Sequence, residues 1–101
     1  MASRLELHNK LIELLGNKNV YYQPPESVKM SYPAIKYSVN RINTKKADGL
    51  MYSKNTQYIV TVIDRSPDNS VINKLLEFPY CSFDRHYVSN NLNHDVLTLY
   101  Y

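Results

Sequence analysis

The chain has 101 residues, of which 44% are hydrophobic and 21% are charged, so intrinsic disorder is excluded and a single α+β domain spanning residues 1–101 is expected. A net charge of +3, spread along the chain, implies only weak and nonspecific attraction to polyanions. The two glycines, Gly16 and Gly49, exclude a glycine-rich phosphate loop, and no apolar run reaches the roughly 18 residues of a membrane span.

The first predicted element is a helix that begins near Ser3 and ends at Gly16. Ser3 and Glu6 match a capping box, in which each side chain pairs a backbone N–H of the first turn. Apolar residues recur along one stripe at helical spacing, namely Leu7, Leu11, Ile12, Leu14 and Leu15. Gly16 suits the left-handed conformation that ends many helices. We expect the apolar stripe to pack on a sheet.

An extended segment and a half-buried strand follow. Residues 20–23 are predicted to be extended, and the two prolines after them prevent this segment from being a central strand. Between residues 33 and 42, Ile35, Tyr37 and Val39 alternate with polar residues. This alternation predicts a strand with one buried face.

The next segment, Asn43–Thr56, is polar and contains the turn signal Asp48-Gly49. We interpret it as a long hairpin connection, with some strand structure around Leu50–Tyr52. Residues 56–64 are rich in β-branched side chains and apolar on both faces. They predict a central strand that helices cover on at least one side.

A second helix is predicted over Pro67–Glu77. Ser66 is a good N-cap, proline is favoured at the first helical position, and Asp68 lies where the helix dipole favours negative charge. Four apolar residues then form a stripe: Val71, Ile72, Leu75 and Leu76.

Two strands close the chain, residues 80–88 and 94–101, and the asparagine-rich segment 89–93 supplies the turn between them. The last strand is expected either inside the sheet or along an edge that pairs with another chain. Together the elements predict an α+β fold with two layers. A mostly antiparallel sheet of four or five strands is packed by two helices and carries a long β-hairpin loop.

Two residues suggest catalysis on their own but lack partners for it. Asp64 ends the predicted central strand beside Arg65, yet no second carboxylate or nucleophile follows at a recognisable spacing. We expect Asp64 to accept hydrogen bonds that fix the strand–helix junction. Cys81 lacks an identifiable base and is expected to be a small buried residue. As the single cysteine, it cannot form an internal disulfide, which fits a reducing cytoplasm.

A metal-binding site is suggested by His86 and His94, together with Asp84 and Asp95, because the last two strands could bring them together. Zinc sites usually have three or four protein ligands at recognisable spacing, and this pattern is not present. His8 lies on a separate predicted helix. We therefore expect these histidines to make hydrogen bonds, with no metal and no cofactor bound.

Cationic and aromatic residues gather in the predicted hairpin: Arg41, Lys45, Lys46, Tyr52 and Lys54. Such a patch is typical of nonspecific nucleic-acid binders. Solvated lysines in a loop are the simpler interpretation. Contact with DNA or RNA through this hairpin remains an alternative, and sequence-specific readout is not expected.

Ten tyrosines and no tryptophan suggest an interaction surface, because tyrosine combines a rigid apolar ring with a polar tip. Three segments carry a resemblance to a family: NVYYQPPESVKMSYPAIKY, QYIVTVIDRSPDNSVINKLL and CSFDRHYVSNNLNHDVLTLYY. They resemble small neck proteins of long-tailed, siphovirus-like bacteriophages, of the tail terminator or tail completion kind. With the first helix, the resemblance covers nearly the whole chain.

The resemblance implies a structural virion protein that performs no reaction. Its copies would form a ring, hexameric as the family's tail symmetry implies, that caps the tail tube and joins it to the head. The implied partners are the tube protein and the head–tail connector or adaptor proteins, with a passing contact to genomic DNA and none to a membrane. The implied location is the neck of the virion, and the host cytoplasm during assembly.

We assign the interface role to the hairpin and to the terminal strand. The residues are Arg41, Lys45, Lys46, Tyr52, Lys54, Tyr100 and Tyr101. A head completion or adaptor protein one ring higher in the neck is an alternative of the same class. A nonspecific nucleic-acid-binding module is the alternative from another class.

Overall fold

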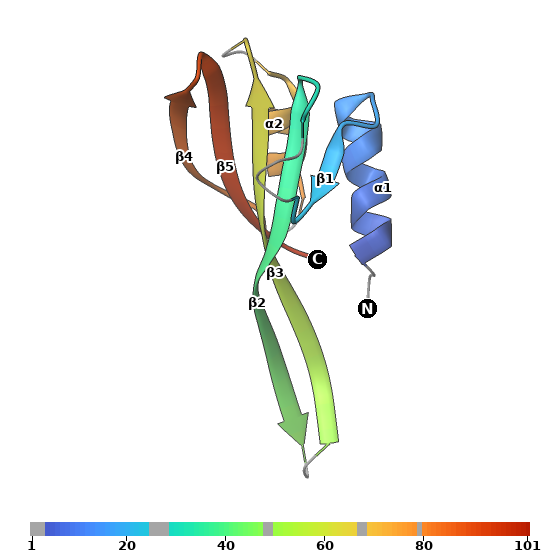
Figure 1. Ribbon diagram of the computed structural model, residues 1–101. Helices are drawn as coiled ribbons and strands as arrows, with labels where there is room; N and C mark the ends of the chain where they lie inside the picture. Colours follow the sequence, from blue (N-terminus) through green and yellow to red (C-terminus); the bar gives the residue numbers. More distant parts are fainter. Residues whose placement is uncertain (1–3, 25–28, 48–49, 67–68, 79) are drawn as a thin grey trace.

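The computed structural model describes residues 4–24, 29–47, 50–66, 69–78 and 80–101, which form one sheet of five strands and two helices (Figure 1). The strands are β1 (Val20–Tyr22), β2 (Ala34–Ala47), β3 (Leu50–Asp64), β4 (Ser82–Ser89) and β5 (Leu92–Tyr100). The helices are α1 (Arg4–Leu15) and α2 (Val71–Leu76). The strand order is β1-β2-β3-β5-β4, with β1 parallel to β2 and all other neighbours antiparallel. The predicted α+β class is confirmed.

One face of the sheet packs against both helices and holds the hydrophobic core. The helices contribute Leu7, Leu11, Val71 and Leu75, all of them buried. The strands contribute Val20, Ile35, Tyr37, Tyr58, Val60, Val62, Leu97 and Leu99. The predicted apolar stripe of the first helix and the predicted buried face of β2 are therefore confirmed.

Helix α1 ends where the sequence predicts. Gly16 has a φ of 82°, in the left-handed region, and its N–H donates to the carbonyl of Ile12 over 2.9 Å. Ser3, the predicted N-cap, lies outside the described residues. The short strand β1 is an edge strand, as the prolines after it require.

The middle of the sheet is built from β3 and β5. The prediction of a central strand is confirmed for β3, which has β2 on one side and β5 on the other. The last strand of the chain lies inside the sheet, between β3 and β4. Asn90 and Asn91 both have positive φ, 52° and 61°, and they form the tight turn between β4 and β5.

The predicted hairpin connection is mostly strand. β2 continues to Ala47 and β3 begins at Leu50, with a paired ladder between them. The predicted hairpin and the strand around Leu50–Tyr52 are therefore confirmed, and the strands extend further than predicted. The predicted turn Asp48-Gly49 lies outside the described residues. Polar residues can form strands here because alternate residue pairs exchange backbone N–H···O=C bonds across the ladder.

Helix α2 is shorter than predicted. It begins at Val71 instead of Pro67, its N-cap position is Ser70, and Ser66 does not cap it. Pro67 and Asp68 lie outside the described residues. Asn69 supplies the missing cap, because its side-chain oxygen accepts the N–H of Val71 over 2.8 Å.

Neither helix found in the described part of the chain is long and apolar enough to cross a membrane.

Candidate interaction surfaces

The β2–β3 hairpin extends beyond the rest of the sheet. We call its outer residues, 42–47 and 50–55, the arm. The last pair between β3 and β5 joins Gln57 to Tyr100, so the described residues of the arm pair only within the β2–β3 ladder. Figure 1 shows the arm leading away from both helices and from the other strands. The molecule is correspondingly elongated, 52 Å by 28 Å by 23 Å.

The base of the arm is fixed by side chains. The ladder is irregular between Val39 and Arg41. Next to this irregularity, the side-chain amide of Asn40 donates to the Gln57 side-chain oxygen over 2.6 Å, and the Gln57 amide donates to the Tyr100 hydroxyl over 2.9 Å. The direction of the arm is thereby tied to β5.

The structure brings some of the predicted interface residues together and separates others. Arg41 pairs with Gln57, which pairs with Tyr100, so Arg41 and Tyr100 lie in one row at the base of the arm. Tyr101 lies toward the helices, where its ring is 5.1 Å from the Lys10 ammonium. Four others lie along the arm, away from this row: Lys45, Lys46, Tyr52 and Lys54. Their contacts with partners stay predictions.

A polar cluster ties α1 to the body of the sheet. The Tyr37 hydroxyl lies 2.7 Å from Nδ1 of His8 and accepts from Arg4 over 3.3 Å. Burial, and then the charge of Arg4, lowers the pKa of His8, while burial raises the pKa of Tyr37. Nδ1 of a neutral His8 can accept a hydrogen bond from the Tyr37 hydroxyl, so these titratable groups hold α1 on the sheet.

Asp64 has the structural role that the sequence predicts. One carboxylate oxygen accepts the N–H of Ser66 over 3.2 Å, and the other accepts the side-chain amide of Asn69 over 2.8 Å. Both bonds close the loop between β3 and α2. The neighbouring Arg65 is exposed, and its carbonyl accepts the Asn93 side chain over 3.1 Å.

The two histidines of the last strands lie on opposite faces of the sheet. Nδ1 of His86 is 2.7 Å from an Asp95 oxygen, and the two residues are paired across β4 and β5. His94 precedes Asp95 and therefore points the other way, where it stacks on Tyr87 at 4.6 Å and 10°. One ion cannot be shared by His86 and His94. Within the residues that the structure describes, no cluster of three metal-ligating side chains occurs.

Cys81 is partly buried, less than the sequence analysis expects. Burial, and then the negative charge of Asp84, raises the pKa of the thiol, which disfavours the nucleophilic thiolate. Asp84 itself accepts a hydrogen bond from the Thr98 hydroxyl. This environment is typical of an unreactive cysteine.

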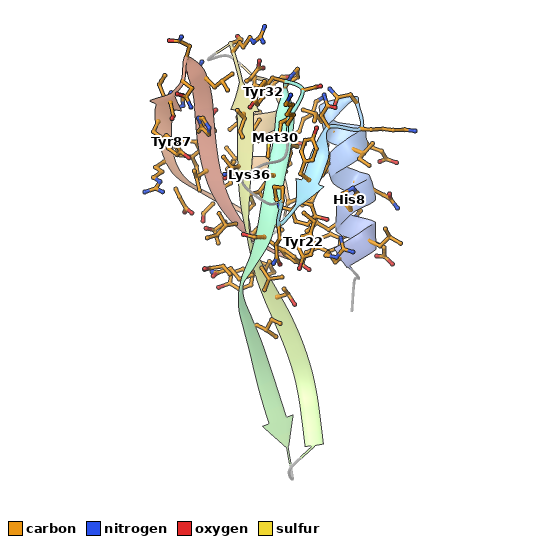
Figure 2. The ribbon with its side chains drawn as sticks, viewed as in Figure 1. His8, Tyr22, Met30, Tyr32, Lys36 and Tyr87 are labelled. Atoms are coloured by element: carbon orange, nitrogen blue, oxygen red, sulfur yellow. The ribbon has the colours of Figure 1, made fainter. Side chains whose placement is uncertain are left out.

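The face of the sheet opposite the helices is hollowed into a cleft of about 660 Å³. Strands β2 to β5 and the segment after β1 line it, with Lys36 on one side and Arg85 and Tyr87 on the other. Figure 2 shows Lys36 on β2 and Tyr87 on β4, with β3 and β5 between these strands. The lining contains no aspartate or glutamate among the described residues.

The outer edge of the sheet is unusually open. All eight residues of β4 are exposed, and they include Phe83, Tyr87 and Val88, with exposed fractions of 45%, 37% and 62%. No described strand pairs with the outer side of β4. A free edge with apolar side chains is a surface on which another protein chain can pair.

Known proteins provide no assignment that could be carried over to these surfaces. No protein-family model matches the chain, and no curated protein sequence matches it. Function is therefore inferred from the arm, the open edge and the cleft.

Proposed function

We propose that this chain is a structural assembly protein of a phage neck. Copies of it form a ring that caps the tail tube and joins the tube to the head, and the chain performs no reaction. The observation that carries the proposal is the arm, a two-stranded ribbon that leaves the body of the sheet.

A two-stranded ribbon on its own is only marginally stable in water, because neither of its faces is packed. The described arm residues have no third strand beside them and lie away from both helices (Figure 1). Contact with another protein would cover this surface. In the proposed neck, the arm would contact a neighbouring copy in the ring, the tube protein or the connector protein.

The open edge of β4 supports the same proposal. A ring requires heterologous contacts, in which one patch of a subunit meets a different patch of the next. The arm and the β4 edge are two such different patches, at separate places in the fold. Exposed Phe83 and Val88 would be covered in a contact of this kind.

Within the neck, the tube-capping position is the one we propose. A head completion or adaptor protein, one ring higher, would use the same two patches, and pull-down with tube protein or with connector protein separates the two positions. The proposed location is the virion neck, with assembly in the host cytoplasm. Genomic DNA would pass through the ring.

Electron microscopy of purified phage tails incubated with the protein tests the proposal. The intact chain is expected to form a density at one tube end. A variant in which a two-residue asparagine-glycine turn replaces residues 43–55 is expected to fold and to leave the tubes uncapped. Uncapped tubes with the intact chain, or tails of normal length made without it, would contradict the proposal.

A matched control separates assembly from nucleic-acid binding. Replacing Lys45, Lys46 and Lys54 with alanine keeps the arm but removes its lysine charges. If nucleic-acid binding is the function, this variant loses DNA retention in a salt-dependent way. If the ring is the function, this variant still caps the tubes. No measurable affinity of the native chain for DNA would exclude the nucleic-acid alternative.

A further inference from the structure

The cleft on the face opposite the helices has a regular charge pattern. Lys36 pairs with Thr61, Thr61 pairs with Val96, and Val96 pairs with Arg85. These four residues form one row straight across β2, β3, β5 and β4. The row carries a cation at each end, and between the cations lie two buried side chains, with exposed fractions of 5% for Thr61 and 8% for Val96.

The neighbouring rows complete the floor of the cleft. Ile59 and Ile63 lie two residues before and after Thr61 in β3, and Ile63 is 3% exposed. Both side chains line the cleft. No ion pair joins Lys36 or Arg85 to a described carboxylate. The cleft therefore combines an apolar floor with two cations that lack an ionic partner within the described chain.

We propose that this cleft binds an extended acidic segment of a partner protein, lying across the strands. Three steps between neighbouring strands separate Lys36 from Arg85, and at ~4.8 Å for each step their backbones lie roughly 14 Å apart. Four residues of an extended chain span about 13–14 Å. Residues i and i+4 of the segment are thus acidic and meet the two cations.

The alternation of side chains along the bound segment determines which kind of residue lies at its middle position. In an extended chain, side chains i, i+2 and i+4 point to the same side. Residue i+2 then faces the buried centre of the row, at Thr61 and Val96, and it is apolar. The recognised pattern is acidic, any residue, apolar, any residue, acidic.

Two other occupants fit less well. The arm of a second copy carries three lysines and no acidic residue by sequence, so it has the same sign of charge as the cleft. Single-stranded nucleic acid needs free aromatic faces for its bases. The Tyr87 ring already stacks on His94 and has the Arg85 guanidinium 5.5 Å from its centroid. Tyr37 is buried, so Tyr32 is the one other described tyrosine of the lining that could receive a base.

The proposal does not depend on the ring. It concerns the face of the sheet opposite the helices, to which β4 contributes Arg85 and Tyr87. It is tested with the full chain and a capped, fluorescent nine-residue peptide. The peptide carries two glutamates four positions apart, leucine midway between them, and serine or glycine elsewhere. A second peptide of the same composition has its two glutamates adjacent. Fluorescence anisotropy is expected to show saturable, salt-sensitive binding of the first peptide and weaker binding of the second.

Charge-removing variants locate the binding. Lys36→Gln and Arg85→Gln are each expected to weaken binding about fivefold, as for loss of one partly solvated ion pair. Lys18→Gln is the matched control, because Lys18 is exposed and lies outside the cleft. Circular dichroism checks that all three variants fold. In the native chain, methyl NMR signals of Ile59, Ile63 and Val96 are expected to shift on binding.

Four results would overturn the proposal. They are the absence of saturable binding up to millimolar peptide, equal affinity for the two peptides, equal weakening by Lys18→Gln, and tighter binding of an oligothymidine at the same methyl groups. The last result would assign the cleft to single-stranded nucleic acid. None of the four bears on tube capping, so the ring proposal stands or fails separately.

Discussion

The β2–β3 hairpin passes through two different environments. In the body, residues 34–39 of β2 pair with residues 58–63 of β3, and the ladder is flanked by β1 and β5 and covered by helices on one face. In the arm, the same two strands continue without described neighbours. The hydrogen-bonding pattern is shared by both regions. The difference between them is packing.

Backbone pairing is therefore enough to form the two strands, whereas burial of apolar side chains stabilises them only in the body. In the body, Ile35, Tyr37, Val60 and Val62 are almost completely buried, and burial of apolar surface stabilises the ladder at about 25 cal/mol per Å². In the arm, Ile42 is 51% exposed. We infer that body and arm have different local stabilities, with the arm held mainly through its base and, in an assembly, through partners.

The largest expected effect comes from the body. Leu11 is fully buried in α1, against the core of the sheet. Leu11→Ala is expected to lower the free energy of unfolding by about 2–5 kcal/mol, because it removes buried methyl groups and leaves a cavity. Urea denaturation followed by circular dichroism measures this change.

Ile42→Ala is the matched change in the arm. Because the Ile42 side chain is half exposed, we expect a change in unfolding free energy within about 0.5 kcal/mol. A cost close to that of Leu11→Ala would mean that the arm and the body form one packed unit, and the distinction between them would be lost.

Local pattern was enough to predict the body. Leu7 and Leu11 follow the helical period, and Ile35 and Tyr37 follow the strand period, because each element has one face against the core. The same alternation placed Lys36 on the face away from the core. For these elements, the pattern of neighbouring residues in the sequence is enough to predict the secondary structure and the buried face.

The arm and the start of α2 depend on contacts that local pattern does not encode. Asn43–Thr56 shows no apolar alternation, because its strands are specified by each other and not by a core. Ser66 has the chemistry of an N-cap, but the hydrogen bonds that Asp64 accepts from Ser66 and Asn69 hold this segment as a loop. Asn69 caps the helix instead. Asn69, two positions before Val71, is the residue in the sequence that marks the start of this helix.

The cleft was not predicted because it depends on strand order. Lys36 and Arg85 lie far apart in the sequence, and only the position of β5 between β3 and β4 brings them into one row. The base of the arm is similar, since Asn40 and Gln57 meet Tyr100 through the same order. Each of these sites is assembled by topology from residues that are unremarkable in their own segments.

A smaller effect is expected where α1 meets the sheet. Tyr37→Phe removes the buried hydroxyl that bonds His8 and Arg4, and we expect it to lower the free energy of unfolding by about 1–2 kcal/mol. Urea denaturation at neutral pH measures the loss. Tyr80→Phe is the control, since that side chain is 82% exposed and its hydroxyl is free to bond water. Equal effects of the two variants would show that the cluster does not hold α1 on the body.

Only a small effect on global stability is expected at the junction between the two regions. Gln57→Ala removes the bonds to Asn40 and Tyr100, and we expect it to change the free energy of unfolding by less than about 1 kcal/mol, because these groups are partly solvated. The rates of amide hydrogen exchange in Gln57→Ala should nevertheless change in the arm and not in the body. Amides of the arm are expected to exchange about fivefold faster, because the base no longer restrains opening, while those of Val60 and Val62 are unchanged.

Asn9→Ala, an exposed change on α1, is the control for this junction. It should leave both regions as they are. Faster exchange throughout the sheet in Gln57→Ala would mean that the body opens together with the arm. Unchanged exchange in the arm would mean that its backbone ladder alone sets the rate at which it opens. The side chains at its base would then determine only the direction of the arm. In the second case, the arm would not depend on its base for local stability, and contact with a partner would be left to supply what packing supplies in the body.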